Sequence, residues 1–261
     1  GGWLKKTEIP ADRPSWSRGF AEINERNQTT LRQLLEASGQ PGGDKKLGDY
    51  YGACMDEARI EATSSAELAE LLKPIEALKT LDDVAREAAR QHLTVGSPFF
   101  HLSSQQDFKD ATRVIGGLDQ GGLGLPDRDY YLKTDPKSAD IQKDYVAHVE
   151  KMLTLAGVPA AQAKGQAAAI FGLEKQLATA SMSRADRRDP KKLYHRIELD
   201  GVLKLAPRFP WQLFLTQLGY GGLREINVLV PAFFEGLNKT LTEQPMDTLK
   251  AYLRWHAIHG V

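Results

Sequence analysis

Apolar residues recur at the spacing of an α-helix along most of this sequence. Near the start, Phe20, Ile23, Leu31 and Leu34 mark one face of a helix that we expect over about residues 17–37. Equivalent patterns predict helices over residues 44–59, 65–78, 81–92, 139–156, 160–184 and 246–259, with shorter amphipathic pieces over 199–205 and 211–218. The chain is therefore expected to be mainly α.

Short apolar runs of a different kind interrupt the helical pattern. Residues 94–102 and 111–115 are rich in β-forming side chains and flank a polar turn, which predicts a β-hairpin. Residues 226–230 are a further candidate strand, and the glycine-rich run 116–126 is interpreted as a loop. The expected fold class is a multi-helical domain with a small β-hairpin.

The segment 116–131 combines Gly-Gly pairs and a Leu-Pro step with the aromatic pair Tyr130 and Tyr131. Glycine permits backbone conformations that other residues avoid, and a tyrosine can anchor a loop by burying its ring. We therefore expect a rigid, packed loop in which Tyr130 or Tyr131 is buried and at least one glycine has a positive φ.

Composition and charge exclude several classes of protein. The 261 residues carry 34 Lys+Arg and 34 Asp+Glu, so the net charge is 0, unlike that of a strongly basic nucleic-acid binder. Hydrophobic residues make up 41% of the chain, enough for a real core, and the apolar run 228–234 is too short to span a membrane. The opening residues 1–6 lack the pattern of a signal peptide, so we expect them to belong to a fold. Cys54 is the one cysteine; no intrachain disulfide can form, and a core thiol is favoured over a reactive one.

No catalytic motif stands out. Zinc hydrolysis usually needs a helical H-E-x-x-H motif, which is absent, and the six histidines are scattered. Only His256 and His259 share a helical spacing, and without an adjacent Glu or Cys they favour packing over metal binding. The sequence also lacks a G-x-S-x-G elbow, a histidine beside Cys54 and a phosphate-binding glycine motif. The residues alone therefore reveal no self-contained active site.

A basic cluster follows the long helix predicted over 160–184. We expect Arg184, Arg187, Arg188 and Asp189 to form a structural network there, with Asp186 and Asp189 as the partners of the arginines. The alternation of charge makes nucleic-acid contact the less favoured interpretation.

Ordered motifs along nearly the whole chain resemble the neprilysin and endothelin-converting-enzyme family of zinc metallopeptidases. They are Gly2-Trp3-Leu4 with residues 7–12, residues 51–56, Gln120 with residues 122–131, Glu174 with Arg184 and residues 187–190, and residues 253–256. Vertebrate members pair the cysteine that matches Cys54, whereas here it stands alone, as expected of a bacterial homologue.

The resemblance implies a zinc-dependent endopeptidase that hydrolyses short peptides in a cavity enclosed by a thermolysin-like catalytic domain and a helical domain. Residues 1–40 are expected to pack toward the catalytic domain, which is absent here, and residues 41–261 to form the helical domain. Zinc is the expected cofactor of the full-length enzyme but not of this fragment. Peptide substrates and the C-terminal catalytic domain are the expected partners, without nucleic acid, and the expected location is extracytoplasmic: periplasmic, secreted or membrane-anchored.

The same resemblance directs attention to substrate binding near Trp16. Some family members offer arginines there to the C-terminal carboxylate of the substrate, but this chain has Ser15 or Trp16 and then Asn24 at the matching positions. Arg18 is only a nearby substitute, so Arg18 and Asn24 are the candidate substrate-binding residues, and no catalytic or metal residue is assigned. We also expect exposed apolar surface at both ends of the chain. The alternative is a free-standing, non-catalytic helical module that binds a peptide or a protein.

Overall fold

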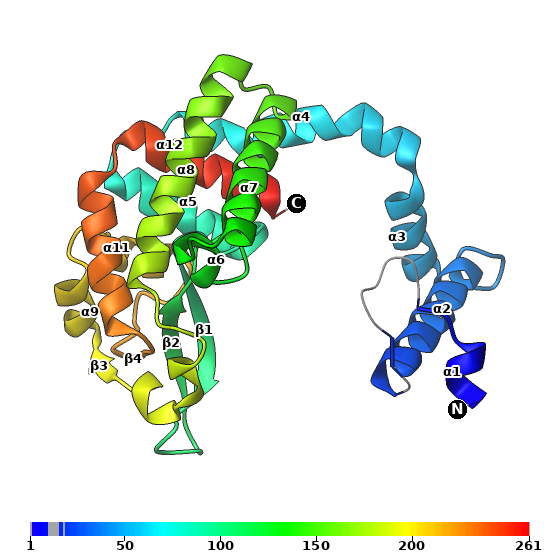
Figure 1. Cartoon of the computed structure of the whole chain (residues 1–261), viewed down its shortest axis with the longest axis horizontal. Helices are drawn as coiled ribbons and strands as arrows, with labels where there is room; N and C mark the ends of the chain where they lie inside the picture. Colours follow the sequence, from blue (N-terminus) through cyan, green and yellow to red (C-terminus); the bar gives the residue numbers. More distant parts are fainter. Residues whose placement is uncertain (1, 10–15, 18, 261) are drawn as a thin grey trace. The chain divides into compact units, whose positions relative to one another are not determined.

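The structure, a computed structural model, describes residues 2–9, 16–17 and 19–260. The chain divides into two compact units, Gly1–Ser65 and Ala66–Val261 (Figure 1). Whether residues 1–40 pack against a catalytic domain remains a prediction.

The first unit is built from helices, and none of its described residues is buried. It contains α1 (Gly2–Lys6), α2 (Phe20–Ser38), α3 (Lys45–Met55) and the beginning of α4 (Glu57–Glu76). The helices α2 and α3 contact each other, yet neither has a buried residue. Gly48 allows their close approach, because a Cβ at this position would lie 2.5 Å from the carbonyl oxygen of Ser38.

Three predictions fail in this unit. The helix expected over 44–59 ends at Met55, because the backbone of Asp56 leaves the helical region and its Oδ1 accepts a hydrogen bond from the N–H of Arg59 at 3.1 Å. A new helix, α4, therefore starts at Glu57 rather than at residue 65. Cys54 is exposed and not a core thiol, because α2, the helix that contacts α3 in this unit, does not cover it.

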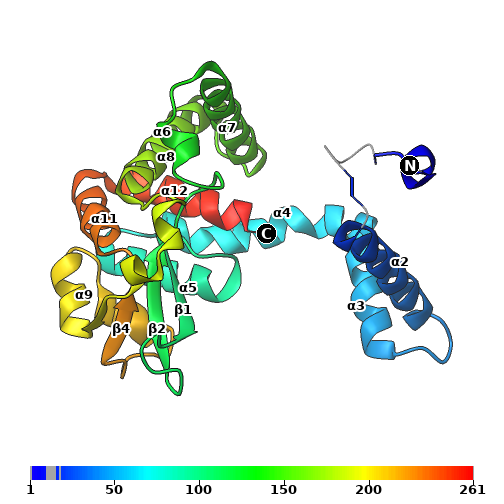
Figure 2. The ribbon, with the colours of Figure 1, turned by 60° about the horizontal axis from the view of Figure 1, so that its bottom comes forward.

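The second unit contains the hydrophobic core, and α8 (Ala160–Ala180) lies at its centre. This helix contacts α7 (Pro136–Leu155), α11 (Pro231–Glu243) and α12 (Met246–His259), and α11 and α8 lie side by side in Figure 2. Small buried residues, Ala163, Ala167 and Ala178, let these neighbours approach closely. The predicted helices over 139–156 and 246–259 are confirmed, whereas the one expected to reach 184 ends at Ala180.

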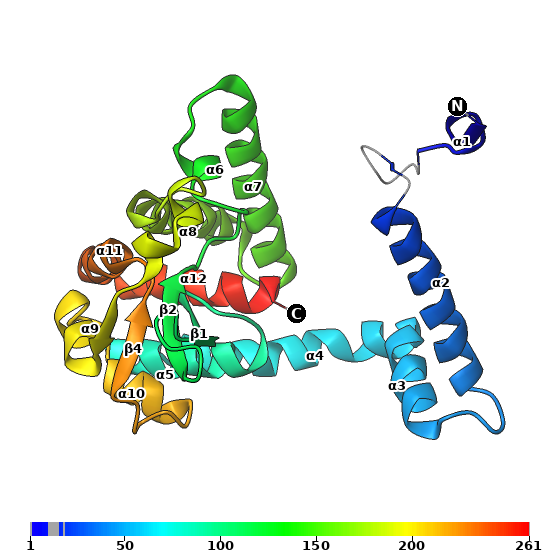
Figure 3. The same ribbon diagram turned by 90° about the horizontal axis from the view of Figure 1, so that it is seen from below.

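The helix α11 was not predicted. Pro231, which breaks the apolar run in the sequence, occupies the first turn of this helix, where its missing N–H costs no hydrogen bond. A second helix, α5 (Leu81–Thr94), was predicted and is confirmed; Thr80 and Asp83 form a capping box at its start. It runs beside α12 in Figure 3.

The expected exposed apolar surface at the C-terminal end is wrong. Trp255, Ala257 and Ile258 are buried, because α12 packs against α5, α7 and α8 within the second unit. Exposure of large apolar residues is instead concentrated in the first unit, at Ile9, Phe20, Ile23, Leu31, Leu34, Leu47, Tyr50, Met55 and Ile60.

A four-stranded sheet with the order β1-β2-β4-β3 completes the second unit. The antiparallel hairpin of β1 (Phe100–Gln106) and β2 (Val114–Gln120) confirms the predicted hairpin, and β2 pairs in parallel with β4 (Glu225–Val228). The last strand, β3 (Arg196–Glu198), pairs antiparallel with β4. Shorter elements link these parts: α6 (Asp129–Leu132), α9 (Leu199–Leu205), α10 (Trp211–Gln217) and the 3-10 helices η1 (Asp186–Arg188) and η2 (Pro190–Leu193).

The interpretation of 116–126 as a loop is wrong for its first half, which belongs to β2. Gly116 and Gly117 lie in the strand, and glycine suits both positions because neighbouring side chains fill the space that a Cβ would occupy. A Cβ on Gly116 would lie 3.1 Å from Ile226 Cγ1, and one on Gly117 would lie 3.0 Å from Gln105 Cδ.

A buried carboxylate fixes the tip of the hairpin. Asp107 is 2% exposed, and its Oδ1 accepts hydrogen bonds from the N–H of Lys109 at 2.9 Å and from Tyr194 Oη at 2.8 Å. Arg196 donates to Oδ2 at 2.8 Å. These bonds to the ionised form, led by that from Lys109, lower the pKa of Asp107 to about 2.

We expect Asp107→Asn to remove part of the acid sensitivity of this fold. Because the folded-state pKa lies below the ordinary value of about 3.9, the contribution of Asp107 is present above that value and is lost as the pH falls toward 2. The melting temperature of the variant should be lower at pH 7 and should fall less steeply between about pH 4 and pH 2. Asp82→Asn, at an exposed helix position, is the control. The prediction is contradicted if the melting temperature of Asp107→Asn falls with pH as steeply as that of the parent protein.

Candidate functional site

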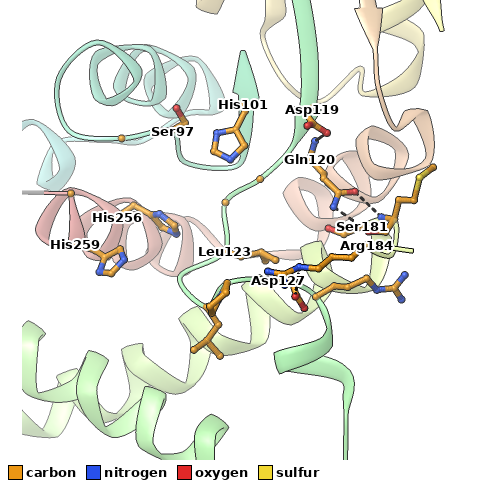
Figure 4. A pocket seen from close by; sticks show the side chains of 18 of the residues that line it. Ser97, His101, Asp119, Gln120, Leu123, Asp127, Ser181, Arg184, His256 and His259 are labelled. Carbon is orange, nitrogen blue, oxygen red and sulfur yellow. Dashed lines mark hydrogen bonds and ion pairs between the residues drawn. The ribbon is translucent and has the colours of Figure 1, made fainter. Parts of the chain in front are cut away.

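A pocket of about 440 Å³ lies in the second unit, where several element ends meet. Its walls come from residues 95–97 after α5, from β1, from the end of β2 with the loop that follows, from the turn after α8, and from the last residues of α12. Figure 4 shows His256 and His259 across this pocket from Arg184.

The hydroxyl groups of two tyrosines hold the loop after β2 in place. Gly122 has φ 72°, its carbonyl oxygen accepts a hydrogen bond from Tyr252 Oη at 2.9 Å, and the same hydroxyl accepts from the N–H of Phe99 at 2.9 Å. Tyr131 is fully buried and accepts a hydrogen bond from the N–H of Leu125 at 2.9 Å. The predicted packed loop, with a buried tyrosine and a glycine at positive φ, is confirmed.

Glu174 on α8 lies behind this loop with no exposed surface. Its Oε2 accepts hydrogen bonds from Tyr131 Oη at 2.8 Å and Tyr145 Oη at 2.7 Å, and Trp255 Nε1 donates to Tyr145 Oη at 2.9 Å. Burial, and next the negative charge of Glu174, raise the pKa of both tyrosines, so both hydroxyls stay protonated donors. The hydrogen bonds around this buried acid thus connect four helices, α6, α7, α8 and α12, with the loop.

Histidine rings pack along α12 beside the pocket. His256 Nε2 lies 3.3 Å from Glu174 Oε1, and its ring centroid is 4.3 Å from that of Tyr252. His259 stacks on Trp255 at 5.0 Å, and burial lowers its pKa. The rings of His256 and His259 pack against aromatic neighbours, as expected from the sequence.

The described residues do not bring metal-ligating side chains together. Across residues 2–9, 16–17 and 19–260, no three side chains of the His, Cys, Asp and Glu types come together in a group that could hold a metal ion. His101 joins His256 and His259 in lining the pocket, but the three do not form such a group.

The arginines after α8 do form ion pairs, but with other partners than predicted. Arg187 binds both carboxylate oxygens of Asp119 at 2.7 and 2.6 Å, and Arg184 Nε lies 2.7 Å from Asp127 Oδ2. Both partners come from β2 and its following loop. Asp186, an expected partner, instead binds Lys192 at 2.7 Å and Ser183 at 2.6 Å.

The other members of the expected network lie apart from it. Asp189 accepts a hydrogen bond from the N–H of Lys191 at 3.0 Å, and Arg188 is exposed. Arg184 and Arg187 line the pocket. The sequence analysis expected the arginines to pair with carboxylates a few residues away. The fold instead supplies carboxylates that lie more than 50 positions earlier in the chain, and a local sequence pattern cannot predict such pairs.

We expect Arg187→Ala to destabilise the second unit by about 1 kcal/mol, a value discounted for the partial exposure of the pair. The variant leaves Asp119, at the end of β2, without its two-bond partner. Thermal unfolding measures the effect. The control, Arg188→Ala, removes an equal charge from an exposed neighbour and should change the melting temperature little. If both variants lower the melting temperature equally, the loss of a positive charge, and not the loss of the Arg187–Asp119 pair, explains the change in stability.

Of the two candidate substrate-binding residues, Arg18 is outside the described residues, and Asn24 is exposed on α2 in the first unit. Their role in substrate binding stays a prediction. The pocket residues Asp119, Arg128 and His101 were not selected from the sequence, although Arg128 lies within the motif 122–131.

No helix in the described parts of the chain is both long enough and apolar enough to cross a membrane.

The sequence matches the model of peptidase family M13 over residues 1–261. Among curated relatives, the chain is 32% identical over 274 residues to endothelin-converting enzyme 1 of Rattus norvegicus, covering 99% of this chain and 35% of the relative. Endothelin-converting enzyme-like 1 of Homo sapiens is 28% identical over 278 residues, covering 99% of this chain and 36% of the relative.

Solved structures agree with this match. The inhibitor complex of the Mycobacterium tuberculosis zinc metalloprotease Zmp1 superimposes with a TM-score of 0.88 at 27% identity, over 98% of this chain and 40% of that one. PepO from Lactobacillus rhamnosis shares the fold with a TM-score of 0.74, over 99% of this chain and 41% of that one. The chain thus spans well under half the length of these proteins.

Proposed function

Because this chain belongs to peptidase family M13, we propose that it is the N-terminal part of a zinc-dependent endopeptidase that hydrolyses short peptides. In this proposal the helical second unit covers the catalytic cavity and limits access to it. Zinc and the catalytic residues belong to the part of the protein that follows this chain. The fragment alone is expected to be inactive.

The observation that carries the proposal is the uncovered apolar surface of the first unit. Phe20 is 91% exposed and Tyr50 is 72% exposed, and α2 and α3 bury no residue. Burial of apolar surface contributes about 25 cal/mol per Å², so such a surface favours a covering partner. The rest of the protein is the partner we propose, because the relatives are more than twice as long as this chain.

A further feature supports the zinc part of the proposal. Zmp1, whose structure superimposes on this chain with a TM-score of 0.88, is named a zinc metalloprotease. An extracytoplasmic location belongs to the proposal and rests on family membership alone; fractionation of cells expressing the full-length protein tests it.

The test is to combine this chain with the separately expressed C-terminal part. We expect a stable complex by size-exclusion chromatography, and cleavage of a quenched fluorescent peptide only when both parts are present. Zinc, measured by elemental analysis after dialysis, should remain with the C-terminal part. Zinc or cleavage activity in this chain alone would overturn the assignment.

A matched pair of variants tests the proposed interface. Leu34→Asp, on α2, should weaken the complex at least about tenfold, because a charge buried in an apolar contact is costly. Leu155→Asp, at an exposed position of the second unit, should not. If the two parts do not associate and this chain is an ordered monomer, the free-standing binding module becomes the better description.

A further inference from the structure

We propose that the pocket between the ends of β2, α8 and α12 binds a carboxylate group of a peptide, with Arg128 as its main partner. This inference rests on the proposed peptidase function. It adds a contact for peptides on the second unit to the candidates Arg18 and Asn24 of the first. The pocket is formed entirely by residues 95–260, within the second unit.

The acidic groups that line the pocket are already engaged. Asp119 is bound through both oxygens by Arg187, and Asp127 is paired with Arg184. The two carboxylates thus neutralise two of the three arginines that line the pocket.

Arg128 is the remaining cation. Its Nε is buried and has no hydrogen-bond partner, and no carboxylate of the described residues lies within ion-pair distance of its guanidinium. Asp186, a carboxylate whose pKa the charge of Arg128 lowers slightly, is itself bound by Lys192 and Ser183. A buried guanidinium nitrogen without a partner is costly, and a carboxylate is the ligand whose geometry a guanidinium fork matches.

Glu174 does not counter this cation. It lies behind the pocket, where Tyr131 and Tyr145 donate to one of its oxygens and His256 lies 3.3 Å from the other. One spare guanidinium suits a single negative charge better than a phosphate dianion, which typically recruits several cations.

The size and walls of the pocket suit the end or a side chain of a peptide. Its volume of about 440 Å³ lies within the range of small-ligand sites, and Leu123, Leu125 and Met182 supply apolar walls for the carbon atoms. The carboxylate could come from the C-terminus of the peptide or from a Glu side chain, and the experiment distinguishes the two.

The experiment measures binding to the 261-residue chain by isothermal titration calorimetry, so that it needs neither zinc nor catalysis. Three acetylated tripeptides are compared: Ala-Leu-Ala with a free C-terminus, Ala-Glu-Ala amide and Ala-Leu-Ala amide. We expect one or both acids to bind at least tenfold more tightly than the neutral amide, and the better acid identifies the source of the carboxylate.

Variants place the binding in the pocket. Arg128→Gln should weaken binding of the acid at least tenfold and Arg128→Lys less, whereas Arg208→Gln, an exposed cation outside the pocket, should leave it unchanged. In NMR spectra of the unmodified chain, the ring resonances of His101, His256 and His259 should shift on titration, and that of His195 should not.

Equal binding of acid and amide, no binding of any peptide at millimolar concentration, or an equal loss from Arg208→Gln would each overturn the inference. These outcomes are separate from a failure of the proposed function, which the assembly and cleavage test reports. Cleavage by the assembled protein without carboxylate binding here would reject the pocket proposal alone.

Discussion

Gly122→Ala should lower the free energy of unfolding by about 3 kcal/mol or more. Gly122 has φ 72°, a conformation that strains any residue with a side chain. A Cβ there would also lie 2.7 Å from the backbone nitrogen of Phe99 and would meet the hydroxyl of Tyr252. Backbone cannot rotate away as a flexible side chain can, so both the loop and the start of β1 must move.

Gly165→Ala is the matched control for this variant. Gly165 lies inside α8, where a Cβ would meet no atom within 4 Å. Alanine favours helix by about 0.5–1 kcal/mol, so this second variant should be slightly more stable than the parent. Chemical denaturation of both proteins measures the difference. A Gly122→Ala protein as stable as the parent would show that the loop is not held as described.

Glu174→Ala should destabilise the protein by about 4 kcal/mol. The substitution leaves the buried hydroxyls of Tyr131 and Tyr145 without their shared acceptor and opens a cavity beside α8. Trp255 donates to Tyr145, so its near-ultraviolet circular dichroism should also change. The removal of one carboxyl group thereby affects the loop, two long helices and the tryptophan of α12.

Two comparisons separate this effect from the loss of a charge. Glu235→Ala, at an exposed position of α11, should change stability by less than about 0.5 kcal/mol. Glu174→Gln keeps an oxygen acceptor at nearly the same volume and should cost less than Glu174→Ala. If Glu174→Ala and Glu235→Ala unfold at the same temperature, the buried hydrogen bonds do not stabilise the protein as expected.

Helices were predictable from the sequence where one face is apolar and the ends carry strong signals. The helix at residues 246–259 was predicted over its observed length, and the helix predicted over residues 81–92 begins at Leu81, where α5 begins. Prediction failed where the deciding contact is distant in sequence. Gly116 and Gly117 look like loop residues until Ile226 and Gln105 are placed beside them.

The candidate site was less predictable than the fold, for the same physical reason. Arg187 and Asp119 are 68 positions apart, and Glu174 is 43 positions from Tyr131. Local spacing cannot report such pairs; it favoured Asp186 and Asp189 because they are near in sequence. Cys54 shows the opposite error, since an apolar helical face predicts burial even where the covering layer is not part of the unit.

The order β1-β2-β4-β3 also sets when this protein can fold during synthesis. Gly117 of β2 pairs in parallel with Asn227 of β4, so a connection of about 100 residues must close before the sheet is complete. Gln91 on α5 donates to the carbonyl oxygen of Leu253 on α12, 162 positions later. The ribosome must therefore release almost the entire second unit before α12 can cover α5. Until then part of the apolar surface of α5 stays uncovered, which favours aggregation of the nascent chain.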